Sequence, residues 1–291
     1  MSTLTPAAAS DLFRREPDRF LDVGAGEAAY RKVGTGPDVL FVHGWPVSGA
    51  TWRLLLPHLA DHVTCHVIDF PSAGSSRFDA ERTELSLDRH IETVRRVVDL
   101  LELDDVAVVG HDSGGMIARH ALTGDPRVRA MGLVDTEQER LGWRFKLFLA
   151  SSRAPGFGKV FGSIVDRRRI RRNQFVLGKA FADPDLLDGE FDEFFLQPLA
   201  DDPDRLRGAL RVLGTFDTRY VDELAALHPR IDVPVKLVWG EDDAFFPVGW
   251  AREMVGSFRD ASLTVVPDAG LFSHEERPAE VAEALLPTLK G

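Results

Sequence analysis

A short stretch in the middle of the chain joins an apolar run, a glycine-flanked acid and a helix. Residues 106–109 are apolar and valine-rich, which is typical of a strand buried on both faces. Asp112 follows, with Gly110 two positions before it and Gly114 two positions after it. This spacing is typical of a strand–turn–helix elbow that presents a nucleophile, because the tight turn leaves no room for a Cβ atom on either side. A carboxylate at the tip would attack carbon and form an alkyl ester, whereas a serine would attack an acyl group.

The same stretch allows two other interpretations. It could be a plain strand–helix turn that happens to hold an aspartate. Residues 111–115 also resemble the serine motif of trypsin-like proteases. Those proteases are all-β and rich in disulfides, whereas this chain alternates strands with helices and has a single cysteine, Cys65. We therefore favour the elbow.

Strands and helices alternate on both sides of the elbow. Residues 20–23 and 28–33 predict a starting hairpin, and further apolar runs predict strands at 38–42, 63–70, 128–134, 233–239 and 261–266. Helices are expected at 50–59, 87–101, from the elbow to 123, at 248–257 and at 273–289. This alternation predicts an α/β fold with a doubly wound, mostly parallel sheet.

Chemistry in such a sheet is expected at the carboxyl ends of the strands. The sequence places a polar or turn-forming group at each of these ends: residues 43–46, Asp69, Asp112, Asp135, Asp243 and the loop after Val266. These positions are the candidates for a common site.

The alternation stops between residues 136 and 228. This stretch has a helical pattern with Gly and Pro breaks and no convincing buried strand, so we expect a helical cap inserted in the core. The expected organisation is a polar lead-in at 1–19 with one helical turn, a core at 20–135 and 229–291, and the cap at 136–228. The basic run at 167–172 is interpreted as a solvated helix face.

Composition limits the partners. The net charge of −11 disfavours nucleic acid and anionic membrane. A single cysteine rules out a disulfide framework, and the charged start of the chain does not resemble a secretory signal, so the cytoplasm is the expected location. With no zinc-type spacing, we expect a cofactor-independent and metal-free protein that takes a small-molecule substrate; the sequence is compatible with a homodimer.

Taken together, the chain resembles the α/β-hydrolase family, in the group of epoxide hydrolases, haloalkane dehalogenases and haloacetate dehalogenases. The resemblance covers about residues 20–290, and the stretches that carry it are 43–46, 69–71, 110–115, 239–243 and 267–278. It implies the α/β-hydrolase fold with a cap. These motifs are specific for the fold and much less so for the reaction.

The resemblance also implies roles for single residues. Asp112 would be the nucleophile, and the backbone amides of Trp45 and Ser113 would form the oxyanion hole. Asp243 would orient a catalytic histidine, and Asp135 is the alternative place for that acid. The Trp45–Pro46 bond is a candidate cis peptide, because the chain must turn sharply there.

The chain departs from the family at the catalytic histidine. That residue would directly follow Gly270, but Leu271 stands there, and leucine cannot take a proton from water. His274 is a candidate replacement, although Ser273 and Glu276 have the spacing of a capping box, which would make His274 a solvent-facing residue at a helix start. His43 and His111 are interpreted as structural residues that hold loops.

The substrate-side groups depart too. Epoxide hydrolases use two cap tyrosines, whereas this chain has only Tyr30 and Tyr220, and Tyr30 lies in the first hairpin. Ser113 and Met116 stand where dehalogenases of this group place a tryptophan or arginines. Substrate contacts are expected from His43, Trp143, Phe145 and Leu271. Cap aromatics should line part of the cavity: Trp143, Phe145, Phe148, Phe161, Phe175 and Phe181.

Three hypotheses of function follow. The first is a hydrolase that acts on a small, mostly apolar organic substrate through Asp112. The second is a non-hydrolytic biosynthetic enzyme, catalysing an elimination, rearrangement or cyclisation, in which Asp112 is a base or electrostatic stabiliser. The third is a ligand-binding protein that has lost catalysis. The absence of a histidine at 271 motivates the last two, and fold alone does not choose among the three.

Overall fold

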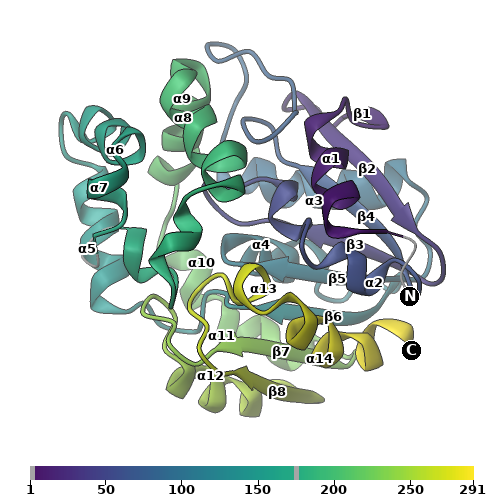
Figure 1. Ribbon diagram of the computed structural model, residues 1–291. Helices are drawn as coiled ribbons and strands as arrows, with labels where there is room; N and C mark the ends of the chain where they lie inside the picture. The colour runs from purple at the N-terminus through teal and green to yellow at the C-terminus, as the bar shows by residue number, and fades with distance from the viewer. Residues whose placement is uncertain (1–3, 174–176) are drawn as a thin grey trace.

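A computed structural model describes residues 4–173 and 177–291 (Figure 1). One sheet has the strand order β1-β2-β4-β3-β5-β6-β7-β8. The strands are β1 (Arg19–Asp22), β2 (Glu27–Gly34), β3 (Asp38–Val42), β4 (Thr64–Asp69), β5 (Val106–His111), β6 (Val128–Val134), β7 (Val235–Gly240) and β8 (Ala261–Val266). β2 pairs antiparallel with β1 and β4, and all other pairs are parallel. The predicted α/β class, starting hairpin and mostly parallel sheet are confirmed.

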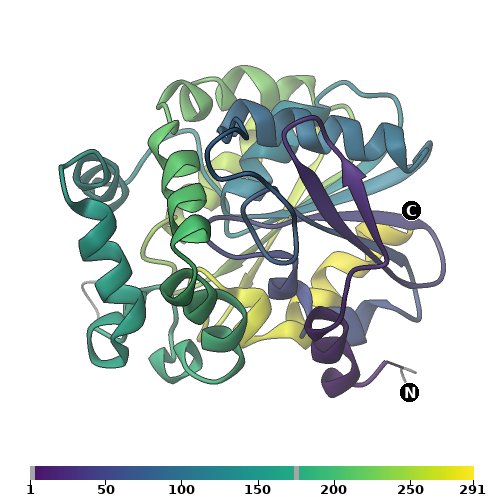
Figure 2. The same cartoon turned by 90° about the horizontal axis from the view of Figure 1, so that it is seen from above.

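Helices cover both faces of the sheet, which is why the central strands are rich in apolar residues. α3 (Leu87–Leu100) and α4 (Ser113–Leu122) pack on one face, whereas α2 (Leu56–Leu59) and α14 (Pro278–Lys290) pack on the other (Figure 2). α12 (Val248–Met254) belongs to the α3 and α4 face. Every residue of β4 and β5 is buried, so these strands hold the residues at their carboxyl ends firmly in place.

Three helices differ from the sequence-based prediction. The lead-in forms a nine-residue helix, α1 (Pro6–Arg14), instead of one turn. The helix expected at 50–59 is a 3₁₀ turn at Gly49–Trp52 followed by α2. The last helix is divided into α13 (Ser273–Glu276) and α14, because Pro278 follows Arg277 and disfavours helical backbone at that residue.

Between β6 and β7 every regular element of the described residues is helical. The longer helices are α5 (Trp143–Ser152), α6 (Phe157–Asp166) and α9 (Pro203–Gly214), with the shorter α7 (Arg168–Arg171), α8 (Gln197–Asp201), α10 (Arg219–Asp222) and α11 (Leu224–Leu227). Four short non-α turns complete this stretch among the described residues: Leu177–Lys179, Pro184–Leu187, the π-helical Asp192–Leu196 and His228–Arg230. Another short turn, Val255–Ser257, follows α12. Figure 1 shows α5, α6 and α7 farthest from the sheet, with α8 and α9 between them and the core. This helical content agrees with the cap hypothesis, and the boundaries of a separate cap domain stay a prediction.

Ion pairs join the N-terminal helix to the helical insert. Glu190 accepts hydrogen bonds from Ser10, Arg14 and Arg53, and Arg14 also pairs with Glu193. Arg53 continues the network to the buried Glu275, at 2.7 Å. In the part of the chain that the structure describes, no helix is long and apolar enough to cross a membrane.

Candidate active site

Asp112 lies at the tip of a strained turn between β5 and α4. Its backbone has φ 50° and ψ −136°, a region that L-amino acids rarely occupy without support from their surroundings. The turn is so tight that a Cβ atom on Gly110 would lie 2.5 Å from the Cα atom of Gly115. The hydroxyl of Thr136 donates to the Asp112 carbonyl at 2.7 Å and supports this conformation. The strand–turn–helix geometry predicted at Asp112 is therefore present.

The two predicted oxyanion amides meet at the Asp112 carboxylate itself. The Trp45 amide donates to Asp112 Oδ2 at 2.8 Å, and the Ser113 amide also donates to this carboxylate. The Ser113 hydroxyl lies 3.4 Å from Oδ2. Burial raises the pKa of Asp112 to about 6, although these hydrogen bonds favour the ionised form. One carboxylate oxygen, Oδ2, is thus held by the Trp45 amide.

The loop that carries Trp45 is fixed on both sides. His43 donates from Nδ1 to the Gly44 carbonyl at 2.8 Å and accepts from the Phe70 amide at 3.0 Å, a structural role as predicted. A Cβ atom on Gly44 would lie 2.5 Å from Asp112 Oδ2, so only glycine lets this loop approach the carboxylate. The Trp45–Pro46 peptide is cis, as predicted.

The two candidate acids have different surroundings. Both oxygens of Asp135 are occupied: Oδ1 accepts from the Gly240 amide at 2.7 Å, and Oδ2 accepts from the amide and hydroxyl of Ser273. Asp243 Oδ1 accepts from the amides of Phe245 and Phe246, at 2.7 and 2.9 Å. Its Oδ2 is buried and has no hydrogen-bond partner among the described residues. Asp243 is therefore the acid with a free oxygen.

The charge of Asp112 couples the acids electrostatically. Burial, and to a lesser degree the negative charge of Asp112, raises the pKa of Asp243 to about 7. Burial and the charge of Asp243 raise the pKa of Asp135 well above its usual value. The hydrogen bonds of the described residues join no histidine to Asp112 or Asp243. Asp243 thus resembles an orienting acid without an imidazole to orient.

Leu271 is buried beside the elbow strand. Its carbonyl accepts a 2.9 Å hydrogen bond from Nε2 of His111, so His111 ties the loop after β8 to β5, as expected of a structural histidine. This backbone hydrogen bond does not by itself place the Leu271 side chain against Asp112. The predicted substrate contact of Leu271 therefore stays a prediction.

The prediction that His274 faces solvent is wrong. Its side chain is fully buried, its ring packs on Trp52 and His111, and Nε2 lies 2.7 Å from the Thr51 hydroxyl. Burial, followed by the nearby His111 and Arg53, lowers the pKa of His274 well below its usual value. These contacts make His274 a buried packing residue and give it no contact with Asp112.

The predicted capping box is also absent. Ser273 is inside the first turn of α13, and its hydroxyl donates to Asp135 instead of capping the helix. Glu276 reaches out of the helix and accepts from the amides of Gly270, Ala182 and Asp183. Ser273 and Glu276 therefore bind groups outside their own helix instead of forming the capping box that their spacing predicts.

Sequence reasoning missed a buried polar network behind the elbow. The fully buried Arg119 donates to the carbonyls of Gly115 and Glu137, to the Thr136 hydroxyl and to His228. The Thr136 hydroxyl lies 2.7 Å from the Asp112 carbonyl and 3.2 Å from Glu137 Oε2, so this third carboxyl lies close to the nucleophile candidate. Burial, and then the charge of Asp112, raises the pKa of Glu137 to about 8. The signal in the sequence was a run of polar residues, 135–139, directly after a buried strand.

Two adjoining cavities lie beside the Trp45 loop. The smaller one measures about 30 Å³ and is lined by His43, Trp45 and Ser113, among others. The larger one measures about 310 Å³ and lies between α1, the loop after β4 and α8. The two share five lining residues: Pro46, Val47, Ser72, Ala73 and Leu199. Asp112 lines neither of them, so the cavity expected against its carboxylate is not found there. The smaller cavity instead reaches Ser113 and Trp45, the two residues whose amides bind that carboxylate.

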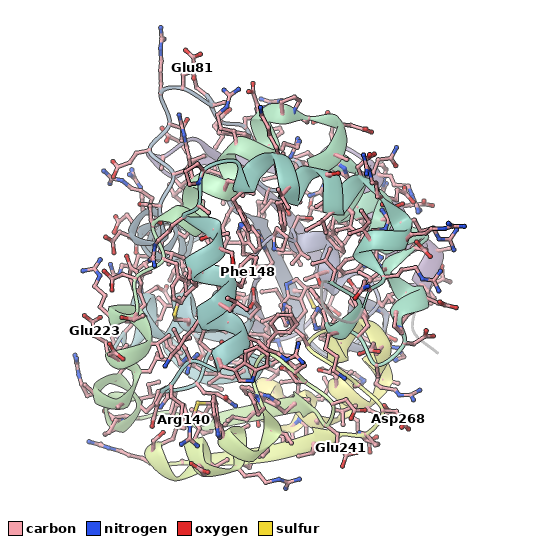
Figure 3. All side chains as sticks on the ribbon, turned by 90° about the vertical axis from the view of Figure 1, so that its left-hand side faces the viewer. Glu81, Arg140, Phe148, Glu223, Glu241 and Asp268 are labelled. Atoms are coloured by element: carbon pink, nitrogen blue, oxygen red, sulfur yellow. The ribbon has the colours of Figure 1, made fainter. Side chains whose placement is uncertain are left out.

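The cap aromatics divide into inward and outward groups. The rings of Phe148 and Phe161 lie 5.7 and 5.4 Å from that of Trp45 (Phe148 is labelled in Figure 3). Phe145 packs on Phe216 and Phe246, and Phe181 stacks on Phe272. Trp143 is 67% exposed, so its predicted place in the substrate site is wrong. Phe175 lies outside the described residues, and none of the other five lines either cavity described above.

The donors needed for a metal centre are not gathered at this site. Among the described residues, no three or more His, Cys, Asp or Glu side chains are arranged to hold a metal ion. Asp112, Asp243 and Glu137 influence one another electrostatically without forming such a group. What the site offers chemically is one carboxylate with an amide-bound oxygen, flanked by two further acids.

Comparison with known proteins identifies the class. The family model described as "Alpha/beta hydrolase family" matches residues 39–284, and the chain belongs to this family. A pimeloyl-[acyl-carrier protein] methyl ester esterase of Chromobacterium violaceum is 28% identical over 255 residues, 84% of this chain and 92% of the relative. Haloalkane dehalogenase 2 of Mycobacterium bovis is 27% identical over 286 residues, 92% and 93% of the two chains.

Solved structures agree on the fold. An alpha/beta hydrolase fold protein from Burkholderia ambifaria matches with a TM-score of 0.78 and 23% identity, over 94% of this chain and 98% of that one. The epoxide hydrolase CorEH matches with a TM-score of 0.76 and 19% identity, over 93% and 97%. At these identities the structures establish a shared fold, while the curated relatives indicate a hydrolase in general terms.

Proposed function

We propose that this protein is an α/β-hydrolase-fold enzyme that acts on a small, mostly apolar organic substrate through Asp112. The observation that carries the proposal is the 2.8 Å hydrogen bond from the Trp45 amide to Asp112 Oδ2. One oxygen of the carboxylate is bound in the oxyanion hole, and the other is left to attack an electrophilic carbon. Relatives that include a haloalkane dehalogenase and an epoxide hydrolase support this class of electrophile.

The first chemical step balances with the groups of this site. A lone pair of the free Asp112 oxygen forms a C–O bond, while the carbon–halogen bond or an epoxide C–O bond breaks and its electron pair leaves with the halide or the alkoxide oxygen. Oδ2 then becomes the carbonyl oxygen of the alkyl ester. It already lies where negative charge would develop if water attacked that ester, so the amides of Trp45 and Ser113 are preorganised for the second step.

The second step lacks its base. Hydrolysis needs a group that takes a proton from water next to the ester. Leu271 cannot do so, and His274 is buried against Trp52 and Thr51. Asp243 keeps a free oxygen, but that oxygen is buried, and its other oxygen binds only the amides of Phe245 and Phe246, so no hydrogen bond links Asp243 to a water-activating group beside Asp112 among the described residues. We therefore propose that the ester forms and that its hydrolysis is slow.

Intact-protein mass spectrometry tests the proposal. The chain is incubated with a panel of small alkyl bromides and epoxides, and we expect its mass to rise by one alkyl or hydroxyalkyl group. Asp112→Asn should abolish the rise, and Asp242→Asn, a neighbouring exposed acid, should leave it unchanged. A mass that never changes, with no product in solution, would contradict the proposal.

A non-hydrolytic enzyme is the second candidate, and one observation favours it. The pKa of Asp112, raised to about 6, suits a general base that works near neutral pH without forming an ester. Product that contains no added water, formed without an adduct and lost in Asp112→Asn, would identify this activity. Ligand binding with no reaction at all would instead identify the ligand-binding hypothesis.

A further inference from the structure

The outer side of α5 and α6 combines exposed apolar side chains with unpaired positive charge. The three most exposed large apolar side chains of the described residues all lie there: Trp143 at 67%, Leu147 at 60% and Val160 at 59%. Exposed leucine or tryptophan residues are unremarkable one at a time, but a group of them on one surface marks an interaction site. Figure 3 looks onto the side of the molecule that α5, α6 and α7 form.

The charge of this segment is opposite to that of the whole chain. Residues 141–165 contain four basic residues and no acidic one, although the chain has 46 acidic and 35 basic residues. Arg144, Lys146, Arg153 and Lys159 take part in none of the ion pairs of the described residues. By contrast, Arg168, Arg171 and Arg172 of the following stretch pair with nearby aspartates. The positive charge of residues 141–165 is therefore not neutralised by an acid of the same segment.

We propose that this surface, the α5–α6 face (Trp143, Arg144, Lys146, Leu147, Lys159 and Val160), docks the protein onto an anionic lipid surface. Shallow insertion of a few apolar side chains combined with attraction of Lys and Arg to anionic headgroups is how peripheral helices bind membranes. Trp143 and Arg144 already stack, with the guanidinium 4.8 Å from the ring centre, so an interfacial aromatic and a headgroup-binding cation lie side by side.

The shape of the face favours lipid over a protein partner. A docked peptide or helix needs a groove, and the two cavities described above contain no residue of α5 or α6. A lipid surface needs only protruding anchors. The whole-chain net charge, which led us to expect no membrane binding, acts weakly here, because charges farther than about 8 Å are largely screened at physiological salt.

The same two helices connect this face to the candidate active site. Phe148 of α5 and Phe161 of α6 pack on Trp45, whose amide binds Asp112. When the face is docked, Phe148, Phe161 and Trp45 would lie on the side of the molecule that faces the lipid. An apolar substrate dissolved in that lipid would then be close to the candidate active site. The docking inference does not depend on catalysis, so the adduct experiment above and the binding experiment below can fail independently.

Vesicle sedimentation tests the inference with the full chain. We expect binding to phosphatidylcholine vesicles that contain phosphatidylglycerol, little binding to pure phosphatidylcholine, and loss of binding in high salt. Lys146→Glu with Lys159→Glu should weaken binding roughly twentyfold or more, since each lost cation costs about fivefold. Trp143→Ser with Leu147→Ser should weaken it about tenfold or more.

Matched controls lie elsewhere on the surface. Leu100, 43% exposed on α3, and the exposed Arg252 of α12 provide Leu100→Ser and Arg252→Glu, which should bind like the parent chain. All substituted side chains are exposed, and circular dichroism checks that each variant is folded. No binding to anionic vesicles at low salt would overturn the proposal, as would equal binding by all variants. A dimer in sedimentation velocity that Trp143→Ser with Leu147→Ser dissolves, without vesicle binding, would assign the face to a second copy and overturn it as well.

Discussion

At the scale of single residues, the site suits the first step of the proposed reaction, which is attack by Asp112 to form an ester. One oxygen of Asp112, Oδ2, accepts a hydrogen bond from the Trp45 amide, and the backbone of Asp112 is held in a strained conformation. Leu271 stands where the resemblance implies the base. The three neighbouring carboxyls, Asp112, Glu137 and Asp243, all have pKa values raised by burial. The residue types thus suit formation of an ester better than its hydrolysis.

His274→Ala separates a packing role from a catalytic one. We expect the free energy of unfolding to fall by about 2–4 kcal/mol, because the change removes a buried ring and its Thr51 partner. The rate of adduct formation at Asp112 should stay within about twofold. Urea unfolding and mass spectrometry measure the two quantities, with His58→Ala, an exposed histidine of α2, as the control. Unchanged stability together with lost multiple turnover would make His274 the base.

At the scale of elements, two loops and one helix meet to form the site. The loop after β3 brings Trp45 to Asp112, the turn before α4 presents the carboxylate, and the loop after β7 brings Asp243. Such a meeting requires backbone to approach side chain closely, and glycine makes this possible at residue 44. The packing of Phe148 and Phe161 on Trp45 fixes the loop from the helical side.

Gly44→Ala should remove the chemistry and keep the fold. The new Cβ atom would lie 2.5 Å from Asp112 Oδ2, so the loop or the carboxylate must move. We expect adduct formation to slow by at least about a hundredfold, as misplacement by about 1 Å commonly does. Gly249→Ala on α12, where nothing lies within 4 Å of the added atom, is the control and should react like the parent chain. Equal rates for both variants would show that the Trp45 loop has no part in the reaction.

Local patterns predicted the elements well and their contacts poorly. The strands and the elbow followed from apolar runs and from glycine spacing around Asp112, which are local features. The oxyanion amides were implied by the family resemblance. His274 and Ser273 did not, because the partners that bury them, Thr51 and Asp135, lie more than a hundred residues away. Trp143 was placed in the cavity as an aromatic residue of the cap and from the family resemblance. Neither showed which side of α5 faces the core.

At the scale of the whole molecule, the raised pKa values of the buried carboxyls make the free energy of unfolding depend on pH. The folded chain binds more protons than the unfolded chain wherever the pKa of a carboxyl is raised on folding. Each such group therefore stabilises the fold at low pH and loses this contribution as the pH rises through the folded pKa. Buried histidines with lowered pKa values, such as His111, act in the opposite direction below about pH 6.5.

Asp243→Asn isolates one of these contributions. The pKa of Asp243 is raised to about 7, so the parent chain loses stability between about pH 4 and pH 7 that the asparagine variant keeps. We expect the variant to be more stable than the parent by on the order of 2 kcal/mol at pH 8, and similar to it at pH 4. Urea unfolding across this pH range measures the difference. Asp242→Asn should show none, and a variant less stable than the parent at pH 8 would contradict the burial of an unpaired charge.

The most direct test of the central claim follows the Asp112 ester over time in the parent chain and in Leu271→His. After a short exposure to a reactive alkyl bromide and removal of the excess, intact mass is recorded at intervals. The account predicts that the adduct persists in the parent chain. In Leu271→His, which places an imidazole at the position that the resemblance gives to the base, the adduct should disappear with release of the alcohol. An ester that the parent chain hydrolyses as rapidly as Leu271→His, turnover after turnover, would contradict it.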